Sequence, residues 1–535
     1  MKRSRTSPKT ADMPLPSHLT DAFASDLRAV LMKDGSPKAL YLESVLLSKY
    51  HSPGGDSASH RRSKAIEKWL STEIVNAATN SRLTAWGSSS VDVLPGISAK
   101  KFLDKVCEVV SHVLPWSPSL DIANCGFSGG ASTSKGRRDS HPAVKFLDKA
   151  DVTRPAYALF NDVNRGSRWA AHLEESGLDP RFVEGNVMFT VPKNSDIDRC
   201  ACKEPDLNMF LQKGLGNQIR TCLKRVGIDL NDQSINRELA RIGSVDGSLM
   251  TLDLSSASDS VSSALVQRVL PPDWFYYMNL VRSPITMIDG MRHVNEMFSS
   301  MGNGFTFELE SLLFYAITRA TAYFGGWKGR ISVYGDDIIA PAGMFDDLVS
   351  TLSFCGFRTN ELKSFSTGSF RESCGAHWDR GVDISPFYLR RPFATISDLI
   401  LTLNQLTSWA SREIGVVDPR YEALLYRYRV FIPEQLWGGG DLTSRRSLVT
   451  GHEPRMELVY PVKDVESHHL GGLLLWLFQT LNRVSEGCLF ITRTTIPAFA
   501  RMRKRRFVDY REGLAEHDVP VFLYKDDPLN VEAVW

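Results

Sequence analysis

The stretch Arg330–Pro341, RISVYGDDIIAP, places two adjacent aspartates, Asp336 and Asp337, between two short apolar runs. A glycine between such runs predicts a hairpin, and the aspartates then lie at its tip. Two neighbouring carboxylates repel one another, and neither can be buried at low cost without a cation. Asp and Gly are also frequent in ordinary turns, so the meaning of this tip depends on what the rest of the chain brings to it.

A second candidate strand supplies a third carboxylate. Residues 248–254 read SLMTLDL, and alternation puts Thr251 and Asp253 on one face and apolar residues on the other. If this strand lies beside the hairpin, Asp253 meets Asp336 and Asp337 at one end of a sheet. Three converging carboxylates require divalent cations among them, and hard oxygen ligands suit Mg²⁺ or Mn²⁺. The pattern therefore predicts a two-ion clamp of the kind that serves in-line phosphoryl transfer.

The composition is that of an ordinary globular protein with several subdomains. Of 535 residues, 43% are hydrophobic and 23% are charged, and the formal net charge of +2 still allows a local basic channel. The 8 cysteines have no regular spacing, which favours a reducing compartment. The segment Gly471–Leu481 has about half the roughly 20 apolar residues of a membrane-spanning helix, so we expect a buried helix and no membrane association. Apolar patterning predicts further helices over residues 19–33, 62–78, 305–324 and 346–354.

The motifs around the three aspartates resemble a known family. They are, in chain order, VPKNSDIDRCACKEP at 191–205, LNDQSIN at 230–236, GSVDGSL at 243–249, DLSSASDS at 253–260, SMGNGFTFELES at 300–311, YGDDII at 334–339 and FRESCGAHW at 370–378. Together they resemble the catalytic (beta) subunit of the replicase of small positive-strand RNA bacteriophages, the levivirus-like RNA-directed RNA polymerases. The resemblance is dense from about residue 187 to 391, thinner from 125 to 186, and weak at both ends.

This resemblance implies an α+β fold shaped like a right hand, with fingers, a palm and a mainly helical thumb. The palm is expected to hold an antiparallel sheet backed by helices. We expect residues 1–80 to begin disordered and then to pack on the fingers or on a partner, residues 81–245 to form the fingers, residues 246–395 the palm, and residues 396–535 the thumb and C-terminal helices. The implied reaction copies single-stranded RNA from nucleoside triphosphates, without a primer.

The family's catalytic positions carry over to four residues of this chain. Asp253, Asp336 and Asp337 match the aspartates that hold two Mg²⁺ ions, with Mn²⁺ as a possible substitute. One ion would lower the pKa of the 3′-hydroxyl and the other would neutralise the leaving pyrophosphate. Lys363 lies where polymerases of this class carry a proposed general acid, although a surface lysine at the end of a strand is an equal alternative.

The resemblance also supplies candidates for contact with the nucleotide. In the cationic segment after residue 192, Lys193, Arg199 and Lys203 are candidates for the triphosphate. A polymerase of RNA must accept and bond the ribose 2′-hydroxyl. The ribose candidates are Asp259, which could also cap a helix, and three residues of the glycine-flanked loop, Ser300, Gly302 and Asn303.

The hairpin Phe370–Gly375 resembles the element that supports the primer strand between palm and thumb. By this resemblance, Arg371 is a candidate for contact with a backbone phosphate. Glu372 is then expected to be the structural partner of Arg371.

The family's enzyme is assembled with host proteins in the cytoplasm of the infected bacterium. The resemblance therefore implies elongation factors Tu and Ts as partners, and sometimes a ribosomal RNA-binding protein and an RNA chaperone. The basic segments 2–9 and 501–506 could bind RNA or an acidic partner. Two alternatives remain. A reverse transcriptase-like polymerase is disfavoured by the small residues 255–257, and a non-catalytic RNA-binding scaffold is disfavoured by the presence of all three aspartates.

Overall fold

The computed structural model describes residues 9–10, 12–51, 57–85, 91–137, 139–413, 415–450 and 456–458. The predicted buried helix at Gly471–Leu481 and the basic segment 501–506 lie outside the described residues, as do residues 2–8 of the basic N-terminus. Within the described part of the chain, no helix is both long enough and apolar enough to cross a bilayer.

A three-stranded antiparallel sheet, in the order β12–β13–β8, lies at the centre of the fold. Its strands are β8 (Leu249–Leu252), β12 (Ser332–Tyr334) and β13 (Asp337–Pro341). Gly335 and Asp336 form the turn between β12 and β13. Gly335 has a φ of +61°, and a Cβ there would meet the Phe307 ring at 2.6 Å, so only glycine suits the turn. Ile338 pairs with Leu252, which confirms the predicted hairpin and its neighbouring strand.

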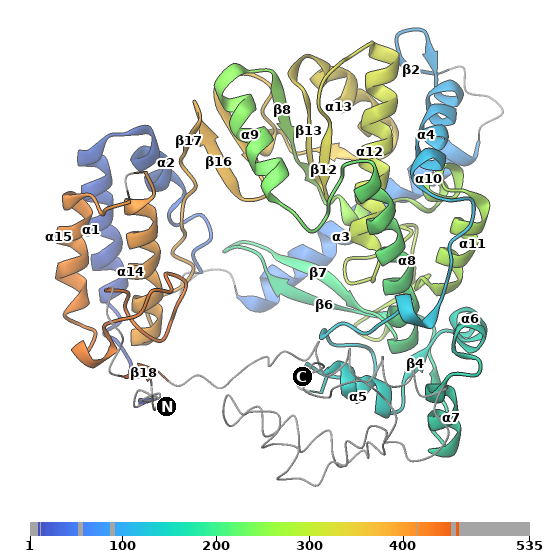
Figure 1. The fold of residues 1–535 in the computed structure, drawn as a ribbon, viewed down its shortest axis with the longest axis horizontal. Helices are drawn as coiled ribbons and strands as arrows, with labels where there is room; N and C mark the ends of the chain where they lie inside the picture. The colour runs from blue at the N-terminus through green and yellow to red at the C-terminus, as the bar shows by residue number, and fades with distance from the viewer. Residues whose placement is uncertain are drawn as a thin grey trace, which may run out of the picture.

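Helices cover both faces of this sheet (Figure 1). On one face, α9 (Ser234–Asp246) packs Leu239 and Ala240 against Leu249 and Ile339. The other face belongs to the largest hydrophobic core of the described residues. Among the helices of that core are α4 (Ala99–Val113), α8 (Asp206–Arg225), α10 (Ser263–Val269), α11 (Pro272–Val281), α12 (Thr306–Gly325) and α13 (Phe345–Phe354).

A second sheet, in the order β11–β10–β6–β7, lies apart from the first. Its strands are β6 (Asn186–Pro192), β7 (Asp198–Lys203), β10 (Ile285–Ile288) and β11 (Met291–Val294). Strands β6 and β7 are antiparallel, and residues 193–197 connect them. The long helix α3 (Ala58–Thr84) lies against β7, and its Ala65 and Trp69 share a small core with Met188.

Segments from both ends of the described chain meet in a helical bundle, on the left of Figure 1. The bundle consists of α1 (Leu19–Asp34), α2 (Pro37–Val45), α14 (Ile396–Ser411) and α15 (Pro419–Arg429). The Phe23 ring meets the rings of Phe393 and Tyr428 edge-on, with centroids 5.6 and 5.0 Å away. Residues 19–46 therefore share a core with residues 387–458, whereas residues 58–80 lie in α3, which packs on β7 within the predicted fingers range.

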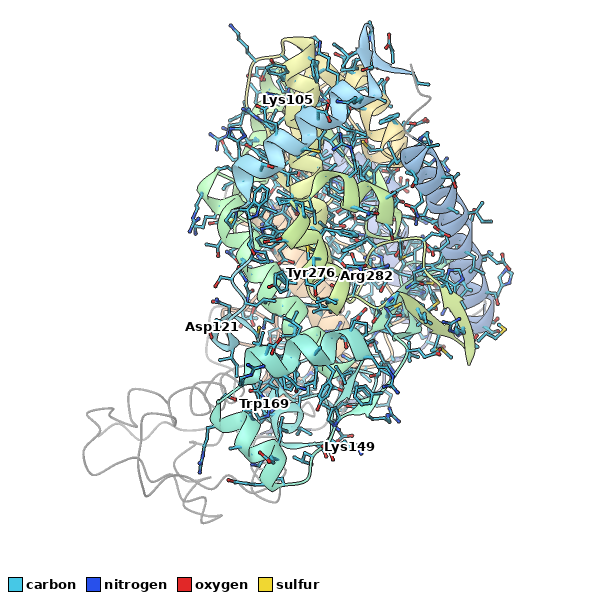
Figure 2. All side chains as sticks on the ribbon, turned by 90° about the vertical axis from the view of Figure 1, so that its right-hand side faces the viewer. Lys105, Asp121, Lys149, Trp169, Tyr276 and Arg282 are labelled. Atoms are coloured by element: carbon cyan, nitrogen blue, oxygen red, sulfur yellow. The ribbon has the colours of Figure 1, made fainter. Side chains whose placement is uncertain are left out.

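A smaller lobe is built around Trp169, which is labelled near the bottom of Figure 2. Its ring meets four phenylalanine rings edge-on, at centroid separations between 5.0 and 5.9 Å: Phe127, Phe146, Phe160 and Phe210. This cluster joins α8 to α5 (Pro142–Leu147), α6 (Arg154–Asn164) and α7 (Arg168–Glu175). The strand pair β4 (Asp151–Val152) with β5 (Arg181–Phe182) lies in the same lobe. Two short pairs lie elsewhere: β1 (Lys9–Thr10) with β18 (Glu457–Leu458), and β2 (Asp92–Leu94) with β3 (Ile97–Ser98).

The chain after β13 returns along the outer edge of β8. Strand β14 (Arg358–Thr359) pairs with β9 (Leu254–Ser255), and Phe365 bridges to Thr251, so residues 358–365 run beside β8. A hairpin sheet follows, with strands β15 (Phe370–Ser373), β16 (Ala376–Asp379) and β17 (Val382–Asp383). The architecture is mixed helix and sheet, as the predicted α+β class requires.

Candidate active site

The three predicted aspartates lie at one end of the central sheet. Asp253 directly follows β8, Asp336 lies in the β12–β13 turn, and Asp337 is the first residue of β13. Burial and the nearby Asp336 carboxylate raise the pKa of Asp253 to about 6, and the same two causes raise that of Asp337 to about 7. Burial also raises the pKa of Asp336. The predicted convergence is found, and the three charges oppose one another.

The carboxylates at this end of the sheet fit a divalent cation whose remaining ligands come from the substrate and water. Asp253 Oδ2 accepts a hydrogen bond from Asn360 Nδ2 at 2.6 Å, and Asp337 Oδ2 accepts one from the Cys374 amide at 3.2 Å. Among the described residues, no three acidic, His or Cys side chains are close enough to enclose an ion by themselves. Mg²⁺ commonly binds one or two carboxylates and takes its other oxygens from water and phosphate. Such an ion would also relieve the repulsion that raises these pKa values.

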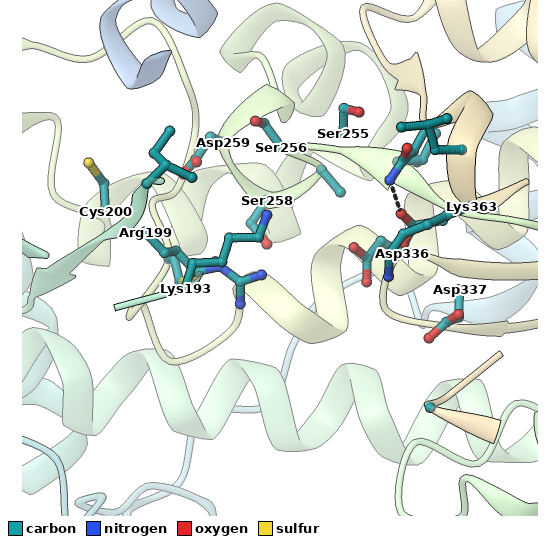
Figure 3. Close-up of a pocket in the computed structure, with 18 of the residues that line it drawn as sticks. Lys193, Arg199, Cys200, Ser255, Ser256, Ser258, Asp259, Asp336, Asp337 and Lys363 are labelled. Carbon is teal, nitrogen blue, oxygen red and sulfur yellow. Dashed lines mark hydrogen bonds between the residues drawn. The ribbon is translucent and has the colours of Figure 1, made fainter. Parts of the chain in front are cut away.

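These carboxylates open into a cavity of about 1090 Å³. Figure 3 shows Lys193 and Arg199 on one side of it and Asp336, Asp337 and Lys363 on the other. The remaining predicted site residues that line it are Asp253, Asp259, Gly302 and Asn303. Lys203 and Ser300 are not among the lining residues. The fold thus gathers nine of the eleven predicted site residues around one space.

Lys193 and Arg199, the two cations across the cavity from the aspartates, come from the tip of the β6–β7 hairpin. Lys193 follows β6, and Arg199 pairs with Val191 near the start of β7. Burial, with the charge of Arg199, lowers the pKa of Lys193. Lys203 lies at the far end of β7, where its Nζ is 5.6 Å from the centre of the Phe189 ring.

The glycine-flanked loop and the turn after β9 contribute two polar atoms that have no partner. Asp259 Oδ1 and Asn303 Nδ2 are both buried and make no hydrogen bond. Burial raises the pKa of Asp259 to about 7. Buried polar atoms are nearly always paired in folded proteins, so an unpaired acceptor and an unpaired donor in one cavity mark a ligand position.

Two neighbouring residues explain the shape of that loop. Gly302 has a φ of +113°, and a Cβ there would lie 2.1 Å from the Cys202 carbonyl oxygen. Ser300 is buried and accepts a hydrogen bond from Asn186 Nδ2 at 2.9 Å, so its hydroxyl faces the protein. The predicted helix cap at Asp259 is wrong, because Asp259 lies in a 3-10 turn and α10 begins only at Ser263.

Lys363 lies in a 3-10 turn, Glu361–Lys363, and not at the end of a strand. Its Nζ is 3.4 Å from Glu372 Oε1. Burial lowers the pKa of Lys363, but the carboxylates of Glu372 and Asp253 outweigh that effect, and the net change is upward. The lysine therefore stays protonated beside the aspartates.

The prediction that Arg371 contacts a phosphate is wrong. Its side chain is fully buried, and its guanidinium donates to the carbonyl oxygens of Leu249 at 2.7 Å and Phe370 at 2.7 Å. Arg371 thus fastens β15 to β8. The expected pairing of Glu372 with Arg371 is also wrong, because Glu372 instead contacts Lys363 and His377.

Sequence reasoning missed a buried carboxyl on the helix behind the turn. Glu310 of α12 lines the cavity and accepts a hydrogen bond from Ser258 Oγ at 2.7 Å. Burial raises the pKa of Glu310 to about 8. An acidic residue inside the long apolar stretch 305–324 was the available signal. Asn360, which bonds Asp253, has no comparable signal in its surroundings.

The chain is similar in sequence to RNA-directed RNA polymerases of bacteriophages. Residues 22–459 match the family described as RNA replicase, beta-chain. The RNA-directed RNA polymerase beta chain of Enterobacteria phage GA is 42% identical over 425 residues, which are 78% of this chain and 79% of the relative. That of Escherichia phage MS2 is 41% identical over 441 residues, 80% of each chain. The RNA-directed RNA polymerase subunit beta of Escherichia virus Qbeta is 39% identical over 422 residues, 75% of this chain and 68% of the relative.

Among solved structures, the BmCPV RNA-dependent RNA polymerase at elongation state aligns with 74% of this chain and 36% of its own. Its identity is 13% and its TM-score is 0.37, too low to support a conclusion. The sequence relatives, by contrast, are close and extend over most of the chain. The chain therefore belongs to the RNA replicase beta-chain family, and its activity is that of an RNA-directed RNA polymerase.

Proposed function

We propose that this polymerase joins ribonucleotides by a two-metal reaction at Asp253, Asp336 and Asp337. The observation that carries the proposal is the convergence of three partly buried carboxylates, all with raised pKa values, on a cavity large enough for a nucleotide. Asp253 and Asp336 would be the principal ligands of two Mg²⁺ ions, with Mn²⁺ as a possible substitute, and Asp337 would add charge. When bound, such ions lower the pKa of the attacking hydroxyl and neutralise the leaving group.

The cations around the cavity would have two roles, binding of the triphosphate and donation of a proton. Lys193 and Arg199 would hold the triphosphate, since both line the wall that faces the aspartates. Lys363 would give its proton to the departing pyrophosphate, because it is protonated and lines the same cavity. Ser300 and Lys203 are better explained as parts of the loop and strand than as contacts to the nucleotide.

Asp259 and Asn303 would select the ribose. A 2′-hydroxyl can donate to Asp259 Oδ1 and accept from Asn303 Nδ2, which would pair both orphaned atoms at once. A deoxyribose would leave both atoms unpaired. This arrangement favours RNA synthesis over the reverse transcriptase-like alternative, and an intact cavity disfavours the non-catalytic scaffold.

The right-hand organisation remains part of the proposal. The central sheet would be the palm, within residues 246–395. Strands β6 and β7 would belong to fingers within residues 81–245, and their sheet also includes β10 and β11 from the predicted palm range. The helices from residue 396 onward would form the thumb, with α1 and α2 of the first 80 residues packed on them. Initiation would need no primer.

The relatives are named as a beta chain or a subunit beta, which supports a role for further subunits. We propose host elongation factors Tu and Ts as these subunits, with a ribosomal RNA-binding protein and an RNA chaperone as further candidates. The enzyme would act on its RNA template in the cytoplasm of an infected bacterium. These partners are assigned by family alone.

The test is incorporation of labelled ribonucleotides on a single-stranded RNA template with Mg²⁺, with and without factors Tu and Ts. We expect Asp336→Asn to abolish synthesis and Asp346→Asn, an exposed aspartate on α13, to leave it intact. Copying by Asp336→Asn at the wild-type rate would refute the two-metal assignment. Synthesis by the wild type without added factors would keep the polymerase but remove the obligatory partners.

A further inference from the structure

A chain of contacts leads from Lys363 to the helical bundle. Lys363 Nζ is 3.4 Å from Glu372 Oε1, and His377 Nε2 is 3.5 Å from the same oxygen. On the other side of the imidazole, His377 Nδ1 is 2.7 Å from the Tyr41 hydroxyl. Tyr41 belongs to α2, so the chain joins the turn of Lys363, the β15–β16 hairpin and the bundle.

One arrangement of protons satisfies every contact in this chain. The Tyr41 hydroxyl donates to Nδ1 of His377, and the Nε2–H of the same ring points at Glu372. This assignment needs a neutral imidazole, and burial does lower the pKa of His377. In this arrangement Glu372 Oε1 is the acceptor of both the His377 and the Lys363 contacts.

Packing encloses the Tyr41 and His377 end of this chain of contacts and leaves the Lys363 end exposed. The Tyr41 ring lies 5.4 Å from the Phe370 ring and 5.5 Å from the His377 ring, and His377 is buried. The side chain of Lys363, by contrast, is 52% exposed. A lysine has a long flexible stem, so its position depends on whatever holds its ammonium group.

The carboxylates of the catalytic centre compete for that ammonium group. Asp253 and Asp337 both attract Lys363 and, with Glu372, raise its pKa. Without Glu372, the lysine would move toward the aspartates and oppose the binding of a divalent cation there. Glu372 instead holds the ammonium group 3.4 Å from its own Oε1, and the lysine still lines the cavity on the side of the aspartates.

We propose that Glu372 is a positioning residue that holds Lys363 at the cavity rim, in place for proton transfer. His377 and Tyr41 in turn hold Glu372. Because Tyr41 belongs to α2, the helical bundle sets the position of the proton donor. The inference rests on the proposed role of Lys363.

The experiment compares single-nucleotide incorporation by the assembled polymerase in wild type, Glu372→Gln, Lys363→Met and the double variant. Loss of the donor should slow the maximal rate by about 100- to 10,000-fold. Loss of its positioning should slow it by about tenfold, with little change in nucleotide affinity. The double variant should be no slower than Lys363→Met alone, because Glu372 acts through the lysine.

Two further variants make the test specific. Tyr41→Phe removes only the last hydroxyl and should slow the rate by a smaller factor, about two- to fivefold, which Lys363→Met should also cancel. Glu361→Gln removes an exposed carboxylate from the same 3-10 turn and should keep the wild-type rate. Glu372→Gln should also raise the Mg²⁺ concentration needed for half-maximal rate, but not in the Lys363→Met background.

The outcomes separate the two proposals. If Lys363→Met incorporates at the wild-type rate, the role of the lysine is wrong and the inference falls with it. If Lys363→Met is slow but Glu372→Gln is not, the positioning chain alone is refuted. A double variant whose loss equals the product of the single losses would also overturn it, because Glu372 would then act independently.

Discussion

Replacing Asn303 with alanine tests the ribose assignment at a single atom. The Nδ2 group of Asn303 is buried without a partner, while its Oδ1 accepts the Phe305 amide at 3.0 Å. A ribonucleotide would supply the missing acceptor through its 2′-hydroxyl. A deoxyribonucleotide would close the cavity over an unpaired donor.

The size of the effect follows from these contacts. A net hydrogen bond contributes about 0.5–1.5 kcal/mol, and a buried donor left unpaired costs about 1–3 kcal/mol. Asn303→Ala removes the bond to ribose and also the penalty against deoxyribose. The preference for ribonucleotides should therefore fall by about 1–3 kcal/mol, or about 5- to 150-fold in the ratio of kcat/KM values.

The assay is the kcat/KM for ATP and for dATP opposite the same template base, at fixed Mg²⁺. A matched control is Asn360→Ala, since Asn360 lines the same cavity but bonds Asp253. That variant should slow both nucleotides by similar factors and keep their ratio. Asp259→Ala should lower the ratio as Asn303→Ala does, and the double variant should lose less than the sum because one hydroxyl serves both residues.

Two results would refute this reasoning. The first is an unchanged ratio in Asn303→Ala, which would mean that the sugar is read elsewhere. The second is an equal fall in Asn360→Ala, which would mean that the ratio reports general damage to the cavity.

Substitutions at Gly302 and Glu310 test the structure around the site through their effects on the stability of the folded protein. Gly302→Ala puts a Cβ against the Cys202 carbonyl at a φ of +113°, whereas Gly290→Ala meets only the backbone cost, since nothing lies within 4 Å. Urea unfolding should show a loss of about 1–2 kcal/mol for Gly290→Ala and at least about 1 kcal/mol more for Gly302→Ala. Burial raises the pKa of Glu310 from 4.5 to about 8, so the folded state holds a proton that the unfolded state releases, and stability should fall as pH rises through that window. Glu310→Gln removes that slope, and its melting temperature relative to wild type should be higher at pH 8 than at pH 5.

Local patterns predicted the elements that local chemistry determines. The helix predicted over residues 19–33 is α1, Leu19–Asp34, and the alternation of residues 248–254 leads correctly to a strand beside the hairpin. Gly335 marks the turn because no other residue fits its φ and the nearby Phe307 ring. Such signals need only neighbouring residues, so they can be read without the fold.

Contacts between distant segments could not be predicted in this way. The packing of α1 and α2 on α14 and α15 depends on apolar faces that would fit many partners. The burial of Arg371 depends on carbonyl groups that become available only when Leu249 is brought beside β15. Every residue has a backbone carbonyl, so the sequence gives no sign of which carbonyl groups will accept hydrogen bonds from Arg371. An arginine in a motif associated with RNA binding is therefore readily predicted to contact phosphate.

Arg199 and Lys203 of β7 show how strand geometry narrows a set of residues that a motif predicts for triphosphate binding. Arg199 and Lys203 are four residues apart and lie on the same face, since alternate side chains point the same way. At about 3.3 Å per residue they are separated by about 13 Å along the strand, so both cannot reach one phosphate group. The β6–β7 connection at residues 193–197 fixes which end faces the aspartates, and Arg199 is near that end while Lys203 pairs with Val187 at the other. The motif contains three candidate cations, Lys193, Arg199 and Lys203. Because the turn lies at the cavity end of the hairpin, Lys193 and Arg199 are the two that line the cavity.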